Sequence, residues 1–353
     1  MTYPATIVPR NSAEHGLVDA AKLVIARRTG SVDRLVALAA SDMAGVDALI
    51  AARMQSPVSV IPALADHLIE AGGKRLRPLL TVAAARLMGG HGDRCIKLAA
   101  AVEFIHTATL LHDDVVDASG LRRGKVAAHL IWGAPSSVLV GDFLFARAFE
   151  LMVETGSLGA LEILARASRV IAEGEVLQLS RAHDLALSQA TYLEIISAKT
   201  AELFAAAAEA GAVSAGADAA ASAALRAFGQ NLGLAFQLAD DALDYDGSTE
   251  TLGKNAGDDF REGKATLPLL LAIARLGPRE VDFWQRAIGR QEQTSDDFRR
   301  ARELIVGTGA LEATLDLATS YAEDAKLALA IFPPTPWRDG LEALADFAVS
   351  RRA

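Results

Sequence analysis

Residues 98–117 read LAAAVEFIHTATLLHDDVVD, and residues 228–244 read FGQNLGLAFQLADDALD. Both segments are apolar over most of their length, and both end in the acidic pattern DDxxD. A helix that is apolar nearly all round is typical of a protein core. The two segments therefore predict two buried helices, each with a group of carboxylates at its end.

The spacing of the acidic residues allows each group to hold a cation. At 3.6 residues per turn, positions i and i+4 share one helix face, so the outer two carboxylates of each copy point the same way, with the third beside them. Such carboxylates are costly in a core unless they are paired or bind a metal, and Mg²⁺ takes carboxylate oxygens together with oxygens of a substrate phosphate. Two groups facing one cavity predict a metal site for a diphosphate, whereas a single copy would more often be a solvated helix face. The six residues are Asp113, Asp114, Asp117, Asp240, Asp241 and Asp244.

Composition restricts the class of protein. The chain has 353 residues, 51% of them hydrophobic, which is enough for a large core. Its net charge is −9 and it has no dense stripe of Lys and Arg, so no nucleic-acid partner is expected. The single Cys95 permits no internal disulfide and fits a reducing compartment. The chain start lacks the apolar region of a signal peptide, and no uninterrupted apolar stretch reaches the roughly 18 residues of a membrane span. These features predict a soluble cytoplasmic protein without a transmembrane segment.

The rest of the chain predicts an all-α fold. Apolar residues recur at spacings of three and four, and no segment alternates as a half-buried strand does. Breaks rich in glycine and proline divide the sequence into roughly ten or more helices. Residues 1–30 are polar and irregular, which predicts a loosely held N-terminal extension. No linker separates the two acidic motifs, so we expect residues 31–353 to form one large helical bundle around a deep central cavity.

Basic and polar residues form a second set around the acidic motifs. The segment GGKRLRP at 72–78 is a turn that leads into a helix, and it places Lys74 and Arg77 where free N–H groups and the helix dipole favour an anion. His106 lies seven residues before Asp113, two helical turns away on the same face. A structural role stays open for most of the set, because basic turns, core histidines, snorkelling lysines and surface arginines are common. Two sets of acids and bases predict a site for two diphosphates, one held through metal and one by direct charge contacts. The set comprises Lys74, Arg77, His106, Arg122, Arg123, Lys199, Thr200, Gln237, Lys254 and Lys264.

Several longer segments carry a family likeness. In chain order they are GGKRLRP, HTATLLHDDVVD with the following RRGK, GDFLFARAFELM, EGEVLQL, SAKTAELF, FQLADDALDY and GKNAGDDFREGKATLPLL. Together they resemble the motifs of trans-polyprenyl diphosphate synthases, most closely the long-chain members that make octaprenyl or decaprenyl diphosphate for quinone side chains. The resemblance covers nearly everything from about residue 33 onward. Two DDxxD motifs in this order, together with the other segments, are specific for this family. A single DDxxD motif would be weak evidence for it.

The resemblance implies a fold and a site. Such synthases are all-helical isoprenoid synthases and generally homodimers packed through their early helices, so we expect the apolar segment 98–111 to abut a partner. Three Mg²⁺ would lie on the diphosphate of an allylic substrate such as farnesyl diphosphate, and their ligands would be Asp113, Asp117, Asp240 and Asp244. The residues expected to contact the same diphosphate are Arg122, Lys199, Thr200, Gln237, Lys254 and Lys264. Those expected to hold isopentenyl diphosphate are Lys74, Arg77, His106 and Arg123.

The resemblance also implies the reaction and a control of product length. Diphosphate leaves the allylic substrate, the double bond of isopentenyl diphosphate attacks the cation, and the chain grows by five carbons. Ala108 and Thr109 lie five and four residues before Asp113, one turn deeper along the helix, and they are small where short-chain relatives carry aromatics. The product tunnel should therefore continue past this level. Phe149 and Met152 are candidates for its floor, with an ordinary core role as the alternative for each.

Other functions fit parts of the sequence. A shorter-chain farnesyl or geranylgeranyl diphosphate synthase shares the motifs, and a terpene cyclase shares a helical cavity and one DDxxD. A metal phosphohydrolase that uses His112 and Asp113 would leave the second motif unexplained. An inert helical subunit of a hetero-oligomeric synthase would not need complete acidic and basic sets. The interpretation as a long-chain polyprenyl diphosphate synthase accounts for every motif, and it predicts a product that is delivered to a membrane.

Overall fold

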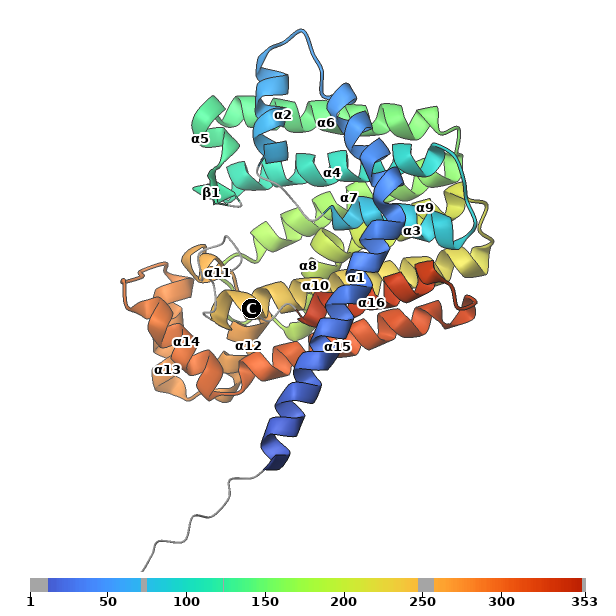
Figure 1. Cartoon of the computed structure of the whole chain (residues 1–353). Coiled ribbons are helices and arrows are strands. Elements are labelled where there is room, and N and C mark those ends of the chain that lie inside the picture. The colour runs from blue at the N-terminus through green and yellow to red at the C-terminus, as the bar shows by residue number, and fades with distance from the viewer. Residues whose placement is uncertain (1–11, 71–74, 123, 247–256, 351–353) are drawn as a thin grey trace, which may run out of the picture.

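Helices make up most of the structure, a computed structural model that describes residues 12–70, 75–122, 124–246 and 257–350 (Figure 1). For residues 12–31, 65, 69 and 70 the backbone alone is described. The predicted all-α fold is confirmed. The helices are α1 (Ser12–Arg53), α2 (Val60–Glu70), α3 (Leu76–Leu87), α4 (Arg94–Val116), α5 (Ala128–Trp132), α6 (Ala134–Glu154), α7 (Leu158–Ser180), α8 (Gln189–Ile196), α9 (Glu202–Ser214), α10 (Ala219–Asp246), α11 (Asp258–Arg261), α12 (Leu267–Arg275), α13 (Pro278–Trp284), α14 (Asp297–Gly307), α15 (Ala310–Ala328) and α16 (Pro336–Ser350).

Two departures from the α-helix lie near the acidic motifs. A π-helical turn, Ser197–Ala201, joins α8 to α9. A hairpin of two antiparallel strands, β1 (Leu121–Arg122) and β2 (Lys125–Val126), follows the first motif. Strands of two residues are too short to show the alternation that identifies a strand, so the sequence did not predict this hairpin.

The N-terminal helix is longer than expected. The prediction of an irregular extension over residues 1–30 is wrong for residues 12–30, because α1 runs without a break from Ser12 to Arg53. The segment is rich in alanine, and one internal glycine costs a helix only about 1 kcal/mol. Further along, α1 packs against α3, α4 and α16 and buries Leu35, Ala39 and Val46.

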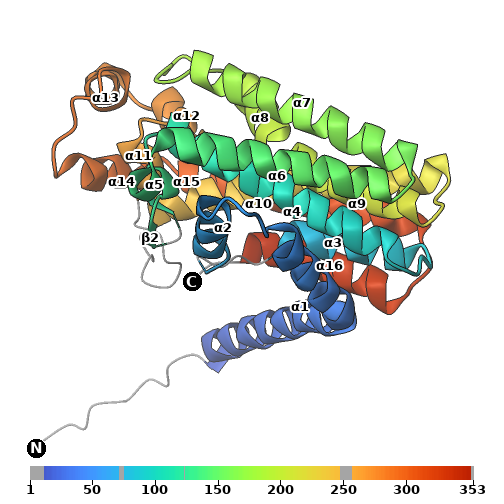
Figure 2. The same ribbon diagram turned by 90° about the horizontal axis from the view of Figure 1, so that it is seen from above.

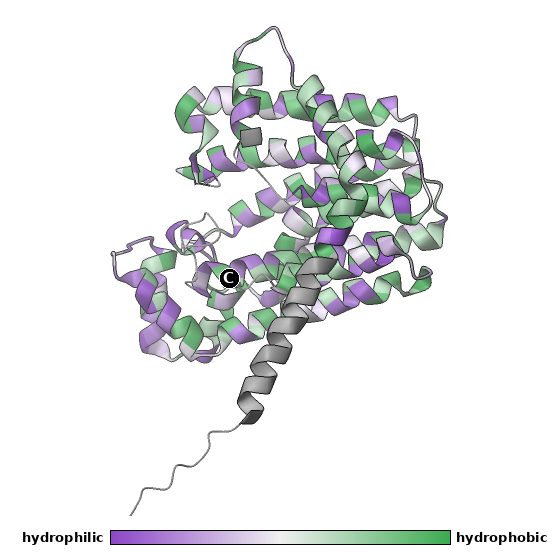
Figure 3. Cartoon of the chain, viewed as in Figure 1, coloured by the Kyte–Doolittle hydropathy of each residue, from purple (hydrophilic) through white to green (hydrophobic). Residues whose placement is uncertain are grey.

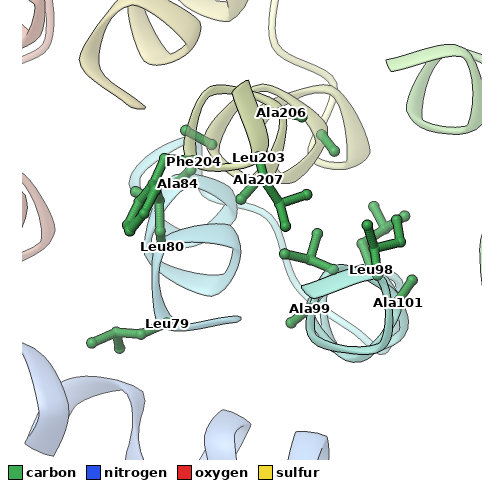
Figure 4. Close-up of a cluster of buried hydrophobic side chains, with 14 of the residues drawn as sticks. Leu79, Leu80, Ala84, Leu98, Ala99, Ala101, Leu203, Phe204, Ala206 and Ala207 are labelled. Atoms are coloured by element: carbon green, nitrogen blue, oxygen red, sulfur yellow. The ribbon is translucent and has the colours of Figure 1, made fainter. Parts of the chain in front are cut away.

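The main core lies where α3, α4 and α9 meet. Leu80 and Ala84 of α3, Leu98 of α4, and Leu203 and Phe204 of α9 gather between the three helices and are almost completely buried (Figure 4). Full burial of a leucine or phenylalanine contributes about 1.5–3 kcal/mol relative to its exposed state. On one side α6 packs along α4, and on the other α10 packs against α9 and α15 (Figures 1 and 2). This core places the two motif helices in one body.

A second cluster of buried residues surrounds the C-terminal half of α10. It includes Tyr245, Phe260 and Trp284 and is formed with helices α11 to α15. Tyr321 and Val349 pack against both clusters. Hydrophobic and hydrophilic residues interleave along most helices (Figure 3), as amphipathic helices require. The two clusters are therefore adjacent, and the single domain over residues 31–353 stays a prediction.

Both motif helices are buried, as their sequences predict. Leu98, Phe104 and Leu111 of α4 are at most 1% exposed, and Phe228 and Leu238 of α10 are completely buried. A helix that is apolar on all sides needs neighbours on all sides, and α4 finds them in α1, α3, α6 and α9 of its own chain. The segment 98–111 therefore does not offer the apolar surface that we expected to abut a partner.

Within the part of the chain that the structure describes, two helices are long and apolar enough to cross a membrane by length and composition. This outcome differs from the expectation that we drew from uninterrupted apolar stretches. The helices are Val32–Arg53 and Arg94–Val116, whose most apolar windows are 22% and 61% buried inside the protein. Core helices of soluble proteins meet the same criteria, so the finding is weak evidence for a membrane span.

Both motif helices end at or just after their acidic residues. Ala118 has a left-handed backbone conformation (φ 51°), which stops α4 directly after Asp117. Arg302 of α14 donates hydrogen bonds to the carbonyl oxygens of Tyr245 and Asp246 at the end of α10, at 3.1 and 2.7 Å. The C-terminal end of a helix carries a partial negative charge. Each motif therefore adds its carboxylates at a position that already favours a cation.

Candidate active site

The middle aspartate of each motif is buried and held by protein groups. Asp114 is 1% exposed, and Arg122 Nε of the hairpin donates to its Oδ1 at 2.7 Å. Asp241 is 2% exposed, Gln237 Nε2 donates to its Oδ1 at 2.7 Å, and Tyr192 Oη donates to its Oδ2. Burial raises the pKa of Asp241, while these two hydrogen bonds favour its ionised form. Both middle aspartates are therefore oriented by the fold.

The outer aspartates of the first motif are half-buried and meet lysines from other elements. Lys199 Nζ lies 3.6 Å from Asp113 Oδ2, and Lys264 Nζ donates to Asp117 Oδ2 at 3.0 Å. Lys264 follows the second motif in the sequence. Its contact with Asp117 therefore brings the segment after the second motif against the first motif.

Asp244, the last aspartate of the second motif, fixes the start of the segment that follows. It accepts hydrogen bonds from the backbone N–H groups of Gly257, Asp258 and Asp259, each at 3.1 Å. Burial raises the pKa of Asp244 to about 7 and Asp259 adds to the effect, whereas these N–H groups oppose it. Asp240, one turn earlier, is half-buried. The two outer aspartates of this motif thus share one face of α10, as the spacing predicts.

Among the described residues, the carboxylates of the site outnumber its lysines. Burial raises the pKa of Asp113, Lys199 partly offsets it, and Asp117 adds to it. Burial also raises the pKa of Glu175 to about 7, although Lys199 Nζ donates to Glu175 Oε2 at 2.7 Å. Burial lowers the pKa of Lys264, but the carboxylates around it outweigh this effect and raise it. An added cation would relieve this excess of charge.

Hard divalent cations suit this set of donors. Mg²⁺ commonly takes one or two carboxylates and completes its shell with water and phosphate oxygens. Within the described ranges, no three His, Cys, Asp or Glu residues gather closely enough to form a metal site by themselves. The outer carboxylates at the two helix ends are the residues that would hold such a cation, together with oxygens of a substrate.

Lys199 and Thr200 lie in the π-helical turn Ser197–Ala201, between α8 and α9. Close packing holds the turn on two sides. A Cβ added at Gly174 of α7 would lie 2.7 Å from a side-chain atom of the turn, and one added at Gly233 of α10 would lie 2.5 Å from a backbone atom. π-helical turns are rare and frequent at functional sites. This turn brings Lys199 and Thr200 to the two motif helices.

Two residues predicted to hold isopentenyl diphosphate come together at the start of α3. Arg77 Nη1 lies 3.1 Å from His106 Nε2 of α4, and the Arg77 guanidinium lies 4.3 Å from the ring centre of Phe204. A cation over an aromatic face is held electrostatically, so Phe204 of the core helps to place Arg77. Three further predicted site residues lie outside the described residues: Lys74, Arg123 and Lys254.

The residues predicted to set product length differ in how far they are buried. Ala108 of α4 and Met152 of α6 are completely buried, and Thr109 is half-buried. Phe149 is 42% exposed on α6, because it follows the buried Ala148 and is therefore turned by about 100° from that face. This exposure does not favour a place at the floor of a tunnel inside the protomer, and the role of Phe149 in product length stays a prediction. Met152 stays a candidate for the floor.

Sequence patterns did not identify Glu175 and Tyr192 as parts of the site. Glu175 lies within the segment EGEVLQL, and an acid in an amphipathic helix is ordinarily assigned to its solvated face. Tyr192 carries no charge and fits the apolar pattern of α8. Its pairing with Asp241 joins residues 49 positions apart, which no local pattern reveals.

Several known proteins are similar to this chain. The family described as polyprenyl synthetase matches residues 58–305. Octaprenyl diphosphate synthase of Escherichia coli (strain K12) is 45% identical over 321 residues, which cover 91% of this chain and 99% of that protein. A polyprenyl synthase from Caulobacter crescentus CB15, crystallised in complex with calcium and isoprenyl diphosphate, is 80% identical with a TM-score of 0.89, covering 91% of this chain and 98% of that one. A decaprenyl diphosphate synthase from Rhodobacter capsulatus is 52% identical with a TM-score of 0.86, covering 91% and 99%.

Proposed function

The chain belongs to the polyprenyl synthetase family, and we propose that its two aspartate motifs hold Mg²⁺ while isopentenyl diphosphate is added, head to tail, to an allylic diphosphate. It is a prenyltransferase of the long-chain trans-polyprenyl diphosphate synthase type. The resemblance drawn from the sequence motifs is thereby confirmed. A phosphohydrolase or a terpene cyclase does not fit this family.

The contact between Lys264 and Asp117 carries the proposal about the site. It joins the segment that follows the second motif to the first motif, while Lys199 lies beside Asp113 from the π-helical turn. Both acidic motifs and two lysines thus border the same site. A diphosphate held through metal and by direct charge contacts needs this combination.

The residues around the motifs fit the proposed reaction. The outer aspartates of the two motifs would hold a divalent cation, which would act as a Lewis acid and draw negative charge from the breaking C–O bond. Lys199, Lys264 and Arg122 bind the diphosphate, which leaves with the electron pair. The double bond of isopentenyl diphosphate forms the new C–C bond to the allylic cation, and the departed diphosphate accepts the proton that is lost. Oxygens of Thr200 and Gln237 stabilise the positive charge, and the apolar residues of α4 exclude water.

For the metal, we propose three Mg²⁺ per site. Their ligands in this proposal are the half-buried outer aspartates, whose middle neighbours are already engaged by protein groups. The relative from Caulobacter crescentus CB15 was crystallised with calcium and isoprenyl diphosphate, which supports a role for a divalent cation here. The proposed ligands are Asp113, Asp117, Asp240 and Asp244.

For the product, we propose octaprenyl or decaprenyl diphosphate made in the cytoplasm and delivered to a membrane as a quinone side chain. The relatives that carry the names octaprenyl and decaprenyl diphosphate synthase support this range. The small, buried Ala108 also supports a long product, because it leaves room one turn below the first motif.

For the assembly, we propose a homodimer formed through α5 and α6. Leu130 and Ile131 of α5 are 59% and 49% exposed, and Leu139 and Val153 of α6 are 66% and 64% exposed. Large exposed apolar residues on neighbouring helices are typical of subunit contacts. Light scattering of the purified protein should give twice the mass of the 37.0 kDa chain; an active monomer would contradict the proposal.

One assay tests the proposed function against its alternatives. The protein is incubated with Mg²⁺, farnesyl diphosphate and labelled isopentenyl diphosphate, and the products are compared with polyprenol standards after dephosphorylation. We expect labelled products of roughly eight to ten isoprene units. Labelled geranylgeranyl product alone would favour the shorter-chain alternative. Hydrolysis, cyclisation or no reaction would contradict the proposed function, and the last of these would favour the inert subunit.

Arg77→Ala should chiefly raise the KM for isopentenyl diphosphate. Arg77 is predicted to contact a diphosphate that does not leave, so it contributes mainly uniform binding. A hydrogen bond to a charged group is worth about 1.5–3 kcal/mol, which corresponds to a rise of about ten- to hundredfold. Steady-state kinetics with each substrate varied in turn provide the measurement. We expect the same direction for Lys74→Ala, whereas Lys199→Ala should act on the allylic substrate.

Arg86→Ala is the matched control for Arg77→Ala. Arg86 lies at the other end of α3 and pairs with Asp42, with Nε 2.9 Å from Asp42 Oδ2, so its loss should lower stability and leave both KM values unchanged. If Arg77→Ala weakened only the binding of the allylic substrate, the two diphosphate sites would be reversed.

A further inference from the structure

Tyr192 closes a chain of hydrogen bonds that runs through predicted site residues. Thr200 Oγ1 donates to Gln237 Oε1 at 2.9 Å, and Gln237 Nε2 donates to Asp241 Oδ1 at 2.7 Å. Tyr192 Oη donates to the other oxygen of the same carboxylate. Tyr192 is 3% exposed and Asp241 is 2% exposed. Hydrogen bonds in such a buried setting are electrostatically stronger than in water, and leaving one unmade is costly.

These hydrogen bonds link two helical segments, and the backbone between Tyr192 and Thr200 closes them into a ring. Tyr192 and Thr200 belong to α8 and the π-helical turn that continues it, whereas Gln237 and Asp241 lie one turn apart on α10. The first segment therefore contacts α10 at both ends of the ring. Ser188 caps the start of α8, its hydroxyl accepting from a backbone N–H at 3.1 Å, so the tyrosine end of the ring is itself fixed.

The ring also determines which way the amide of Gln237 points. Its NH₂ group faces an oxygen of Asp241, so its carbonyl oxygen faces Thr200 and accepts the hydroxyl proton. A rotated amide would place its carbonyl oxygen against the carboxylate and would lose the hydrogen bond to Asp241, although the Thr200 hydroxyl could then accept from the NH₂ group. Tyr192 holds the second carboxylate oxygen and thereby keeps the first one facing Gln237.

We propose that Tyr192 is a positioning residue, which acts through Asp241 and Gln237 to hold Thr200 in place for the allylic diphosphate. The inference rests on the proposed function, in which Thr200 and Gln237 contact that substrate. Tyr192 itself does not touch the substrate. A tyrosine with a purely structural role in the core would change stability and leave substrate affinity unchanged, so the two roles differ in a measurable way.

Tyr192→Phe removes one hydrogen bond and keeps the aromatic ring in the core. A hydrogen bond to an ionised acceptor corresponds to about a ten- to hundredfold effect, and an effect that passes through Asp241 and Gln237 should lie at the lower end. We therefore expect the KM for farnesyl diphosphate, and its Kd measured by titration calorimetry, to rise about tenfold. The KM for isopentenyl diphosphate should stay at the wild-type value. An unchanged affinity for farnesyl diphosphate in a folded Tyr192→Phe protein would overturn the proposal.

Tyr245→Phe is the matched control. Tyr245 is completely buried on α10 directly after the second motif, and its hydroxyl has no hydrogen-bond partner among the described residues. The variant removes the same oxygen atom from a similar environment. Both substrate affinities should stay at the wild-type values, and an equal loss in both tyrosine variants would indicate a general packing effect and overturn the proposal.

A double-mutant cycle tests whether the effect passes through the ring. Thr200→Val should also weaken the binding of farnesyl diphosphate. If Tyr192 acts through Thr200, adding Tyr192→Phe to Thr200→Val should change the Kd far less than Tyr192→Phe does alone. Fully additive effects would mean that the two residues act independently, which contradicts the proposal.

The proposal can still be tested if Tyr192→Phe does not fold or if the wild-type protein is inactive. If Tyr192→Phe does not fold, the double variant Tyr192→Phe/Asp241→Asn removes the buried charge together with its donor and should recover the fold with weakened allylic binding. Failure to recover would mean that the hydroxyl supports something other than this carboxylate. If the wild-type protein does not elongate its substrate, the proposed function fails, while the calorimetric comparison still decides the role of Tyr192.

Discussion

Asp113→Ala is expected to lower kcat by about a thousandfold while the protein stays folded. Removal of one preorganised group that stabilises developing charge typically costs about 10²–10³ in kcat, and the loss of a metal ligand also disturbs the cation that draws charge from the leaving group. The effect on stability should be small. Burial raises the pKa of Asp113, with Asp117 adding to it, so the folded protein gains little from this carboxylate in its ionised form.

The measurement combines steady-state kinetics at saturating Mg²⁺ with thermal melting of the same preparation. Asp93→Ala is the matched control at the other end of α4. Asp93 is exposed and pairs with Lys97 at 2.9 Å, so its loss should leave turnover unchanged. Asp240→Ala should behave like Asp113→Ala, because both motifs are proposed to hold the same diphosphate. Nearly normal turnover in a folded Asp113→Ala protein would remove the basis for the metal site.

The different roles of the outer and middle aspartates in each motif were only partly predictable from the sequence. The i and i+4 spacing is a local property of a helix, so the outer aspartates were recognised as a pair on one face. The partner of each middle aspartate depends on the folded chain. Asp114 is held by Arg122, 8 residues away, and Asp241 by Tyr192, 49 residues away. Those contacts distinguish buried aspartates from the half-buried outer ones, and they arise from the tertiary arrangement of the hairpin and of α8 against α10.

For the fold too, features set by the local sequence were predictable, whereas features set by contacts between distant segments were not. Helical periodicity and apolar segments predicted the all-α class and the burial of α4 and α10. The π-helical turn at Ser197–Ala201 was not predicted, because its support comes from close approaches at Gly174 and Gly233 on other helices. The position of Phe149 depends on which face of α6 packs against α4. Family likeness placed it near the tunnel, whereas the structure exposes it.

Ala108→Phe is expected to shorten the main product to roughly three to four isoprene units while the enzyme stays active. Ala108 is completely buried on α4, and one helical turn spans about 5.4 Å, which is similar to the length of an extended isoprene unit. A phenyl ring at this level occupies the path that a longer chain would need. Close-packed neighbours leave the ring little room to turn aside, and overpacking typically costs about 1–3 kcal/mol, which a domain of this size tolerates.

Chromatography of the dephosphorylated products gives the chain length directly, and the initial rate with farnesyl diphosphate shows whether the site still works. Met152→Ala provides the comparison on α6, where Met152 is completely buried: it should lengthen the product if this side chain forms the floor and leave it unchanged if it is only part of the core. A short product from Ala108→Phe at a rate close to wild type requires that the growing chain passes this face of α4. If the product stays long, the chain leaves the metal site in another direction, and the small residues before Asp113 serve only the packing of α4 against its neighbours.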